Sequence, residues 1–361
     1  MHKVMIFDTK KIPVKEAVAA IFKEFVPDLK GKKVLLKPSM LAPTAPDAGV
    51  TTHPVVLEAA VREALARGAD VSVADNPGGL EGNSAGTAKK TGIYDASLGH
   101  FVNYSERLVE VPANCEYTKT FLIPKLVLDS DYIISFPMFK THLLTVLTGA
   151  IKNVYGYIPG AMKSQLHQKA PSRRRFSELL VDLHAIRPPN LHIMDALTYM
   201  QGNGPQHGEV KPLGLILGSD NAVAMDSVQA RMAGIDPSTL HYLVKAKEKG
   251  LGSFEPDQIE IIGEFVTIPD FKPPTTWKLS SQEQAKIIDQ VRSLRPAYNK
   301  ETCIKCGDCA TNCPVQAIQM YDFPSIDKDK CIQCWCCCEL CPEGAMTVPA
   351  EQPKLGSQLL Y

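Results

Sequence analysis

The sequence has no excess of either charge and no long hydrophobic run. Lysine plus arginine number 39, as do aspartate plus glutamate, so the formal net charge at pH 7 is zero. Nucleic-acid-binding domains usually carry a basic surface, so this balance gives no support to bulk nucleic-acid binding. No stretch approaches the ~18 apolar residues of a membrane-spanning helix, and the first residues lack the apolar core of a signal peptide. We therefore expect a cytoplasmic protein with neither a nucleic-acid partner nor a membrane span.

Common cofactor motifs are also missing. Neither the dinucleotide pattern G-x-G-x-x-G nor the phosphate-binding pattern G-x-x-x-x-G-K-[ST] occurs. The sequence contains no flavin motif either, so a flavin or another unidentified second cofactor would have to bind without a recognised motif. No pattern in the chain indicates an oligomeric state.

Cysteine, by contrast, is abundant, with eleven residues. Near the C-terminus, eight of them form two copies of the pattern C-x-x-C-x-x-C-x-x-x-C-P. This is the spacing of bacterial two-cluster ferredoxins, in which the fourth cysteine of each run ligates the other cluster. One 4Fe–4S cluster is therefore assigned to Cys303, Cys306, Cys309 and Cys341. The second is assigned to Cys331, Cys334, Cys337 and Cys313.

Other uses of these cysteines fit less well. Zinc sites usually pair two C-x-x-C units across a longer gap, and disulfides are not expected without a secretion signal. The two runs repeat at an interval of 28 residues, which predicts a pseudo-two-fold domain. Cys336 and Cys338 flank Cys337 and are either small packing residues or an alternative ligand or redox-active thiol.

The first 264 residues predict an α/β domain with an open, mostly parallel sheet and helices on both faces. Short apolar runs, which suit strands buried on both faces, alternate with longer amphipathic segments. The predicted strands are Val34–Leu36, Val71–Ala74, Tyr132–Phe136, Leu191–Met194, Leu213–Leu217 and Ile259–Ile262. The predicted helices are His53–Ala66, Phe176–Ile186, Ala222–Met232 and Thr239–Lys249.

The remaining residues divide into three parts. Residues 265–296 contain several prolines and predict a linker with one helix at Ser281–Arg292. Residues 297–349 predict a small α+β two-cluster ferredoxin-like domain. Residues 350–361 form a short tail.

Polar residues follow several predicted strands. Lys37, Asp75-Asn76, Asp195 and Ser219-Asp220 each stand at such an end. In open α/β sheets the ligand crevice lies beyond the carboxyl ends of the strands, so these residues could converge. The alternative is that polar residues follow any buried strand, because loops are solvated.

The densest group of chemically active side chains lies between residues 137 and 167. Lysines suit anionic oxygens, and histidines can move protons near neutral pH. The group consists of Lys140, His142, Lys152, Asn153 and His167. A second polar segment, Gly202–Gly208, contains Gly204 and His207, and its glycines allow the backbone to approach a ligand closely.

Together these motifs resemble the domain-of-unknown-function 362 family, over most of residues 1–263. The residues that carry the resemblance are Lys37-Pro38, Thr51-Thr52-His53-Pro54, Lys140-Thr141-His142, Thr148-Gly149-Ala150-Ile151-Lys152-Asn153, His167, Asp182, Asp195, Gly202-Asn203-Gly204-Pro205 and Ala224-Met225-Asp226. Many members have asparagine where this chain has Ser39. Members with a C-terminal two-cluster ferredoxin module are common, and the family name implies no particular reaction.

The resemblance implies ligand-binding roles for recurring polar residues of the first domain. We predict a catalytic group of Lys140, His142, Lys152, Asn153, His167 and Asp195. We predict that Lys37, Gly204 and His207 bind a cofactor. Asp226 could be catalytic, metal-binding or a structural partner of a lysine or the backbone.

Three functions are compatible with these patterns. The leading hypothesis is an iron–sulfur oxidoreductase, in which two clusters pass electrons to or from a small anionic or carbonyl substrate in the crevice. An external electron donor or acceptor would supply or remove these electrons. The alternative is an electron carrier or an assembly or maturation partner without substrate turnover. In a third, the clusters are structural and the large domain is a non-redox enzyme.

Overall fold

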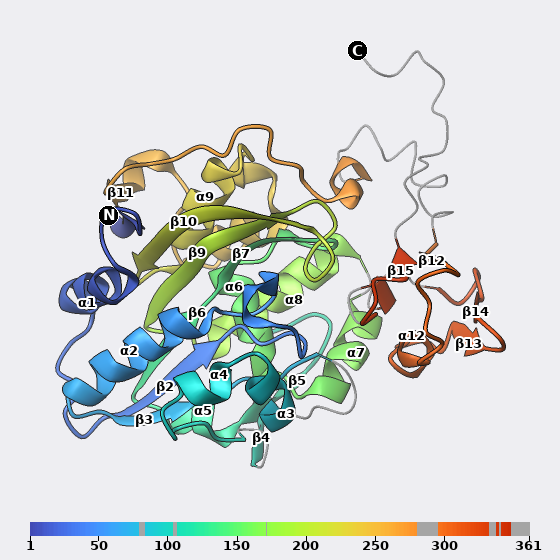
Figure 1. Cartoon of the computed structure of the whole chain (residues 1–361), viewed down its shortest axis with the longest axis horizontal. Coiled ribbons are helices and arrows are strands. Elements are labelled where there is room, and N and C mark those ends of the chain that lie inside the picture. Colours follow the sequence, from blue (N-terminus) through green and yellow to red (C-terminus); the bar gives the residue numbers. More distant parts are fainter. Residues whose placement is uncertain are drawn as a thin grey trace.

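A mixed nine-stranded sheet forms the centre of the large domain (Figure 1). The computed structural model describes residues 1–78, 84–103, 107–170, 172–279, 295–331, 337–338 and 341–347. The strands of this sheet are β1 (His2–Asp8), β2 (Lys33–Pro38), β3 (Asp70–Val73), β6 (Tyr132–Phe136), β7 (Met138–His142), β8 (Val146–Leu147), β9 (Leu191–Gln201), β10 (Glu209–Ser219) and β11 (Ile259–Ile262). The main order is β11-β1-β10-β9-β6-β2-β3, and β7 pairs with β9 and β8.

The sheet is mostly parallel, as predicted. Strands β3, β2, β6 and β9 run parallel to one another, and β1 runs parallel to β11. Strand β10 is antiparallel to both of its neighbours, because it returns from β9 as a long hairpin. Ser219 therefore lies at the opposite edge from the other predicted strand ends, and its hydroxyl donates to the carbonyl of Lys3 at 2.7 Å. The expectation that Ser219-Asp220 joins the crevice is wrong.

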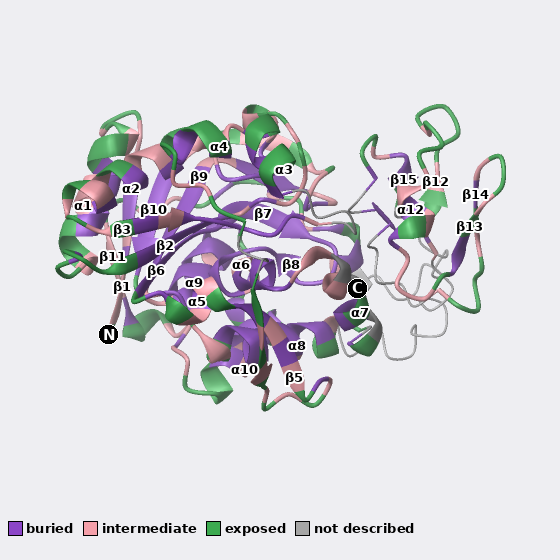
Figure 2. Cartoon of the chain, turned by 90° about the horizontal axis from the view of Figure 1, so that it is seen from below, coloured by how far each residue is buried: buried purple, intermediate pink, exposed green. Residues whose placement is uncertain are grey.

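Helices cover both faces of the sheet. Figure 2 shows the strands as buried and the helices on either side as partly exposed. Side chains alternate between the faces of a strand. Val34 of β2 therefore packs with α1 (Val14–Phe25) and α2 (Pro54–Ala66), whereas Leu35 packs with α8 (Arg173–Ile186) on the other side. The second face also carries α9 (Ala222–Met232) and α10 (His241–Glu248).

Polar caps fix where two of these helices begin. The Ser172 hydroxyl accepts a hydrogen bond from the Arg175 amide at 3.2 Å at the start of α8. Asn221 accepts from the Ala224 amide at 3.0 Å at the start of α9. Such caps satisfy amides that have no partner within the helix.

Shorter elements complete the large domain. The helices are α3 (Ser84–Lys90), α4 (Ile93–Ala96), α5 (Lys125–Asp129), α6 (Ala150–Asn153) and α7 (Gly160–Lys169). Strands β4 (Leu108–Pro112) and β5 (Thr120–Pro124) form a separate antiparallel pair. Turns of 3-10 helix occur at Pro46–Ala48, Val154–Tyr157, Pro237–Thr239, Pro256–Gln258 and Thr275–Leu279. No helix within the described residues is long and apolar enough to cross a membrane.

The first half of the predicted linker packs on the large domain. The Ile268 amide donates to the carbonyl of Met232 at 2.7 Å, and the Thr276 hydroxyl donates to the carbonyl of Leu143 at 2.6 Å. Residues 265–279 are thereby attached to the α/β domain. The helix predicted at 281–292 and the tail 350–361 lie outside the described residues.

A small module, formed by the described residues within 295–347, lies at the end of the molecule opposite the N-terminus (Figure 1). It contains β12 (Ala297–Tyr298), α12 (Asp308–Thr311), β13 (Ile318–Met320), β14 (Pro324–Ile326) and β15 (Met346–Thr347). Tyr298 pairs with Met346, and Ile326 pairs with Ile318. Ile326 lies 28 residues after Tyr298, and Met346 lies 28 residues after Ile318, so the predicted pseudo-two-fold repeat is present in these two strand pairs.

Candidate functional site

A cavity of about 100 Å³ lies at the carboxyl ends of the parallel strands, where the sequence places the crevice. Ser39 follows β2 and Asp75 follows β3, and both line the cavity. The side of the cavity formed by β7, α6 and α7 contributes Lys140, His142, Lys152, Asn153 and His167. The structure therefore brings together the five polar residues predicted between positions 137 and 167.

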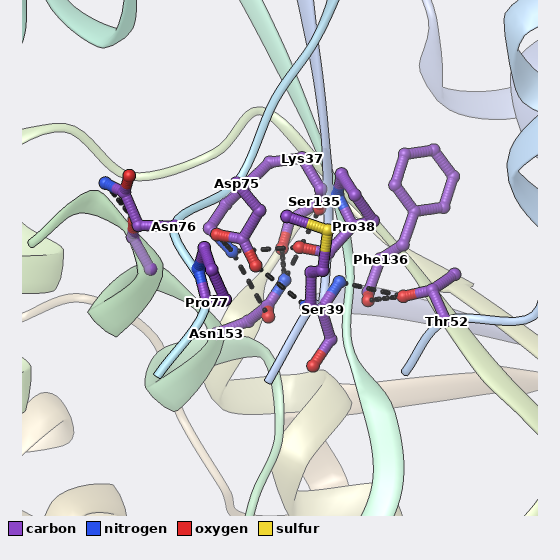
Figure 3. Close-up of polar contacts among 12 residues, drawn as sticks. Lys37, Pro38, Ser39, Thr52, Asp75, Asn76, Pro77, Ser135, Phe136 and Asn153 are labelled. Atoms are coloured by element: carbon purple, nitrogen blue, oxygen red, sulfur yellow. Dashed lines mark hydrogen bonds and ion pairs between the residues drawn. The ribbon is translucent and has the colours of Figure 1, made fainter. Parts of the chain in front are cut away.

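A buried ion pair lies next to this cavity (Figure 3). The Nζ atom of Lys37 is 2.8 Å from Oδ1 of Asp75, and both side chains are almost inaccessible to solvent. Lys37 also donates to the Pro38 carbonyl at 3.0 Å and to Oδ1 of Asn153 at 3.4 Å. Burial lowers the pKa of Lys37, and the attraction of Asp75 opposes that shift. Lys37 thus lies behind the cavity wall and supports it.

Gly156 leaves room for this ion pair. A Cβ atom at that position would lie 2.0 Å from Oδ1 of Asp75 and 2.6 Å from Nζ of Lys37. Both distances are far below van der Waals contact. Only glycine allows the backbone after α6 to approach the pair so closely.

Helix α6 is fixed by a carboxylate from the neighbouring helix α9. Asp226 accepts hydrogen bonds from the amides of Ala150 at 2.6 Å and Ile151 at 3.1 Å. Burial raises the pKa of Asp226 to about 7, while these two hydrogen bonds act in the opposite direction. The backbone-partner interpretation of Asp226 is confirmed. Because Lys152 and Asn153 lie on α6, Asp226 positions both of them.

Lys140 and His142 project from β7, a strand buried along its whole length. Nζ of Lys140 donates to the carbonyl of Val50 at 2.6 Å. Nδ1 of His142 accepts from the amides of Leu144 at 3.1 Å and Thr145 at 3.2 Å. In the neutral ring, the proton of His142 is therefore on Nε2.

Four rings, two of them imidazoles, pack together on the histidine side of the cavity. The rings of His167 and Phe176 stack with centroids 4.4 Å apart. The ring of His142 is nearly parallel to that of Phe176, at 6.5 Å. Tyr155 meets the edge of His167 at 5.7 Å and donates its hydroxyl to the carbonyl of Lys163 at 2.8 Å. These contacts limit the orientations of both imidazole rings.

Lys163, which was not among the predicted site residues, also lines the cavity. Its Nζ donates to the carbonyls of Asn76 at 2.7 Å and Pro77 at 2.9 Å. Burial lowers the pKa of Lys163 to about 7, and the charges of Lys37 and Lys152 contribute in the same direction. A signal was available, because Lys163 precedes His167 by four residues and such pairs share a helix face.

Asp195 does not line the cavity. Its carboxylate accepts hydrogen bonds from the amides of His53 at 2.7 Å and Leu197 at 3.0 Å. Burial raises its pKa, and these two hydrogen bonds oppose that shift. Through these contacts, Asp195 connects β9 to the start of α2.

Gly204 and His207 lie at the junction with the module. A second cavity, of about 170 Å³, is lined by both residues and by Cys338 and Gly344. Nε2 of His207 is 2.7 Å from the carbonyl oxygen of Cys341 and donates to it. Burial lowers the pKa of His207. Neither residue lines the first cavity, so the structure separates them from the lysine group.

The first predicted set of cysteine ligands lies around one small cavity inside the module. Its members are Cys303, Cys306, Cys309 and Cys341. Of the second set, the structure describes Cys313, Cys331 and Cys337, while Cys334 lies outside the described residues, as does Cys336.

Backbone amides point at the sulfur of the fourth cysteine in each run. The Ala317 amide donates to Sγ of Cys313 at 3.2 Å, and the Ala345 amide donates to Sγ of Cys341 at 3.2 Å. Hydrogen bonds to sulfur are among the features that set the reduction potential of a 4Fe–4S cluster. The residues present therefore fit 4Fe–4S binding, and the repeated bond extends the pseudo-symmetry to the ligands.

Comparison with known proteins gives two family matches. The family described as "Domain of unknown function (DUF362)" matches residues 34–231, which is more than half of the chain. A 4Fe-4S binding domain matches residues 295–318. A thylakoid-associated protein from Synechocystis sp. is 29% identical over 223 residues, which cover 61% of this chain and 69% of that protein.

Two solved structures show a distant similarity. One is a crystal structure of a protein from Thermotoga maritima, with a TM-score of 0.36 and 17% identity over 66% of this chain and 57% of that one. The other is the lactate racemase apoprotein from Thermoanaerobacterium thermosaccharolyticum, with a TM-score of 0.36 and 12% identity over 62% of this chain and 54% of that one. The chain spans less than two thirds of the length of either structure.

Proposed function

We propose, from the premise that the chain belongs to the DUF362 family and contains a 4Fe–4S binding domain, that it is an iron–sulfur oxidoreductase. The module would exchange electrons with a small anionic or carbonyl compound held in the cavity beside Lys37. Two clusters, ligated by the crossed cysteine sets, would each carry one electron.

The charge of the cavity supports an anionic ligand. Lys140, Lys152 and Lys163 contribute amino groups to its wall. Among the described lining residues the only acidic side chain is Asp75, and Lys37 already neutralises it. An excess of positive charge in a partly enclosed space attracts anions more strongly than the same charge in water, because screening is weaker there.

Proton donors lie in the same wall. Reduction of a carbonyl group to an alcohol consumes two electrons and two protons. His142, with its Nε2 proton, and His167 both line the cavity and are the groups we assign to proton transfer. The stacking on Phe176 would hold these rings in place during turnover.

The observation that carries the proposal is the loop shared by the cavity and the module. Pro205 lines both the lysine cavity and the second cavity at the module junction. Two residues further on, His207 donates to the carbonyl of Cys341, a predicted cluster ligand. One short loop therefore contacts the proposed substrate site and the electron-carrying module.

Anaerobic reoxidation tests this proposal. Protein reduced in the absence of oxygen is mixed with short 2-oxo acids and short aldehydes, and the return of the cluster absorbance is followed. We expect a compound that reoxidises the parent protein to fail with Lys152→Met, and with Lys140→Ala, at unchanged iron content. Lys23→Ala, an exposed lysine on α1, serves as the matched control and should behave as the parent.

The opposite outcome is equally informative. If both cavity variants retain their iron and reoxidise at the parental rate with every compound, the cavity is not the redox site. The clusters would then serve an external protein, as in an electron carrier or an assembly partner.

A further inference from the structure

Two lysines near the cavity have different sets of hydrogen-bond acceptors. Lys37 has three acceptors within reach, including the carboxylate of Asp75, and these match the three N–H groups of an ammonium ion. Lys163 has two acceptors, the carbonyls of Asn76 and Pro77, and both are uncharged. Among the described residues no carboxylate forms an ion pair with Lys163.

Two carbonyl acceptors match a neutral amine. A neutral lysine has two N–H groups and one lone pair on a tetrahedral nitrogen. With both N–H groups donated to the Asn76 and Pro77 carbonyls, the lone pair takes the remaining direction. Because Lys163 lines the cavity, a molecule bound there would meet Nζ along this direction.

The surroundings of Lys163 favour this neutral form. Burial lowers its pKa to about 7, and the positive charges of Lys37 and Lys152 add to the effect, while Asp75 opposes it. About half of the Lys163 side chains would be unprotonated at neutral pH. An exposed lysine with a pKa of ~10.4 is almost fully protonated there.

We propose that Lys163 is the nucleophile of the cavity and forms an imine with the carbonyl carbon of a small aldehyde or ketone. The Nζ lone pair attacks that carbon and a C–N bond forms. The carbonyl oxygen leaves as water with the two hydrogens of the amine, and a C=N bond remains. No electrons are gained or lost in this step.

The site defines the class of carbonyl compound. Its volume of about 100 Å³ admits only a few non-hydrogen atoms. The amino groups of Lys140 and Lys152 line the same space and suit a negatively charged group on the same molecule. A short 2-oxo acid has both features. This inference takes its site from the proposed function, but imine formation requires no electron from the module.

Reductive trapping tests the inference without cluster turnover. The oxidised holoprotein is incubated with glyoxylate and cyanoborohydride, which reduces an imine to a stable secondary amine, and the modified lysines are located by peptide mass spectrometry. At pH 7 we expect Lys163 to be labelled at least ~10-fold faster than exposed lysines, because far more of it is unprotonated. Acetaldehyde, which has no anionic group, should label Lys163 more slowly.

Matched variants and a pH series complete the test. Lys163→Arg keeps the positive charge but should abolish the preferred adduct. Lys169→Arg, an exposed position on the same helix, should leave it unchanged. In the parent protein, labelling of Lys163 should rise with a midpoint near pH 7. Labelling spread evenly over exposed lysines, or directed to Lys140 or Lys152, would overturn the assignment.

The two proposals can fail separately. If Lys163 is not labelled but the reoxidation still depends on Lys152, the redox function stands and the nucleophile is rejected. If Lys163 is labelled as described but no compound reoxidises the clusters, imine formation stands and the redox function is rejected.

Discussion

Nζ of Lys37 and Oδ1 of Asp75 lie 2.8 Å apart in a fully buried ion pair next to the lysine cavity. The pair connects the ends of β2 and β3, and Asn153 joins it to α6 through Oδ1 at 3.4 Å from Nζ. Three elements that meet at the site therefore depend on one pair of opposite charges. Substitution of either partner should therefore destabilise the site.

We expect Asp75→Asn to destabilise the protein strongly. The substitution keeps the shape of the side chain but leaves the Lys37 ammonium buried without its counter-charge. Removing one partner of a buried ion pair typically costs ~3–5 kcal/mol in the free energy of unfolding. Urea denaturation of the parent and the variant measures the difference.

A double variant and a surface pair provide the controls. The double variant Lys37→Met/Asp75→Leu leaves no charge unpaired. Its loss of stability should therefore be smaller than the sum of the losses in Lys37→Met and Asp75→Leu. Lys3→Met, which removes the exposed ion pair with Glu24, should change stability little. A small effect of Asp75→Asn would contradict the role given to the pair.

Asp226 should make the stability of the protein depend on pH in an unusual direction. Its pKa is raised by burial to about 7 in the folded protein, compared with ~3.9 for an unperturbed aspartate. Between these values the folded state keeps a proton that the unfolded state has lost. The contribution of Asp226 to stability is therefore present at low pH and declines as pH rises from ~4 towards 7.

Urea denaturation across this pH range tests the assignment. The side chain in Asp226→Asn cannot titrate. The unfolding free energy of the parent minus that of the variant should therefore fall as pH rises, and it should level off above pH 7. Asn also presents an amide group to the Ala150 and Ile151 amides, so the variant should be less stable at low pH. A difference that does not change with pH would show that Asp226 is ionised throughout.

Local sequence patterns predicted the buried elements well. Tyr132–Phe136, Ile259–Ile262 and Ala222–Met232 have the predicted limits, because short apolar runs and amphipathic segments depend only on neighbouring residues. The long hairpin was missed. Strands β9 and β10 extend well beyond the predicted apolar segments through mixed polar stretches. Without the hairpin, the reversed direction of β10 could not be inferred.

The residues of the site were likewise predicted only in part. The spacing of residues 137–167 was sufficient to predict that Lys140, His142 and Lys152 come together. Asp195 could not be excluded, because one of its partners, the His53 amide, is distant in sequence. The position of His207 depends on how the module packs, and no local pattern carries that information.

The cysteine assignments predict a crossed pattern of damage. Two four-iron clusters require about eight iron atoms per chain in anaerobically purified protein. Cys309→Ala and Cys341→Ala should each lose the same cluster, because their sulfurs line the same cavity. Iron analysis combined with electron paramagnetic resonance of the reduced variants distinguishes the two clusters.

Cys338→Ser is the matched control for these variants. Cys338 is buried at the module junction and belongs to neither predicted ligand set, so iron content should remain near the parental value. The crossed assignment is wrong if Cys341→Ala instead removes the cluster that Cys331→Ala removes.

His207 should couple the position of the module to the properties of one cluster. Its Nε2 donates to the carbonyl of Cys341 at 2.7 Å, and its ring packs against Gly344, where an added Cβ would lie 3.0 Å from Nδ1. A hydrogen bond of this kind contributes ~1 kcal/mol. We expect His207→Ala to retain its iron but to exchange amide hydrogens faster at Ala345–Thr347, because the module is held less firmly.

The reduction potentials give a second measurement of the same contact. Loss of a donor next to Cys341 changes the field around the cluster assigned to that cysteine, and a change of ~1 kcal/mol corresponds to roughly 40 mV for one electron. We expect one of the two potentials to shift by tens of millivolts in His207→Ala and the other to stay constant. His207→Gln retains an N–H donor and should restore part of both effects. Equal shifts in the two potentials would mean that His207 acts on the module as a whole, whereas unchanged potentials with faster exchange would limit its role to docking.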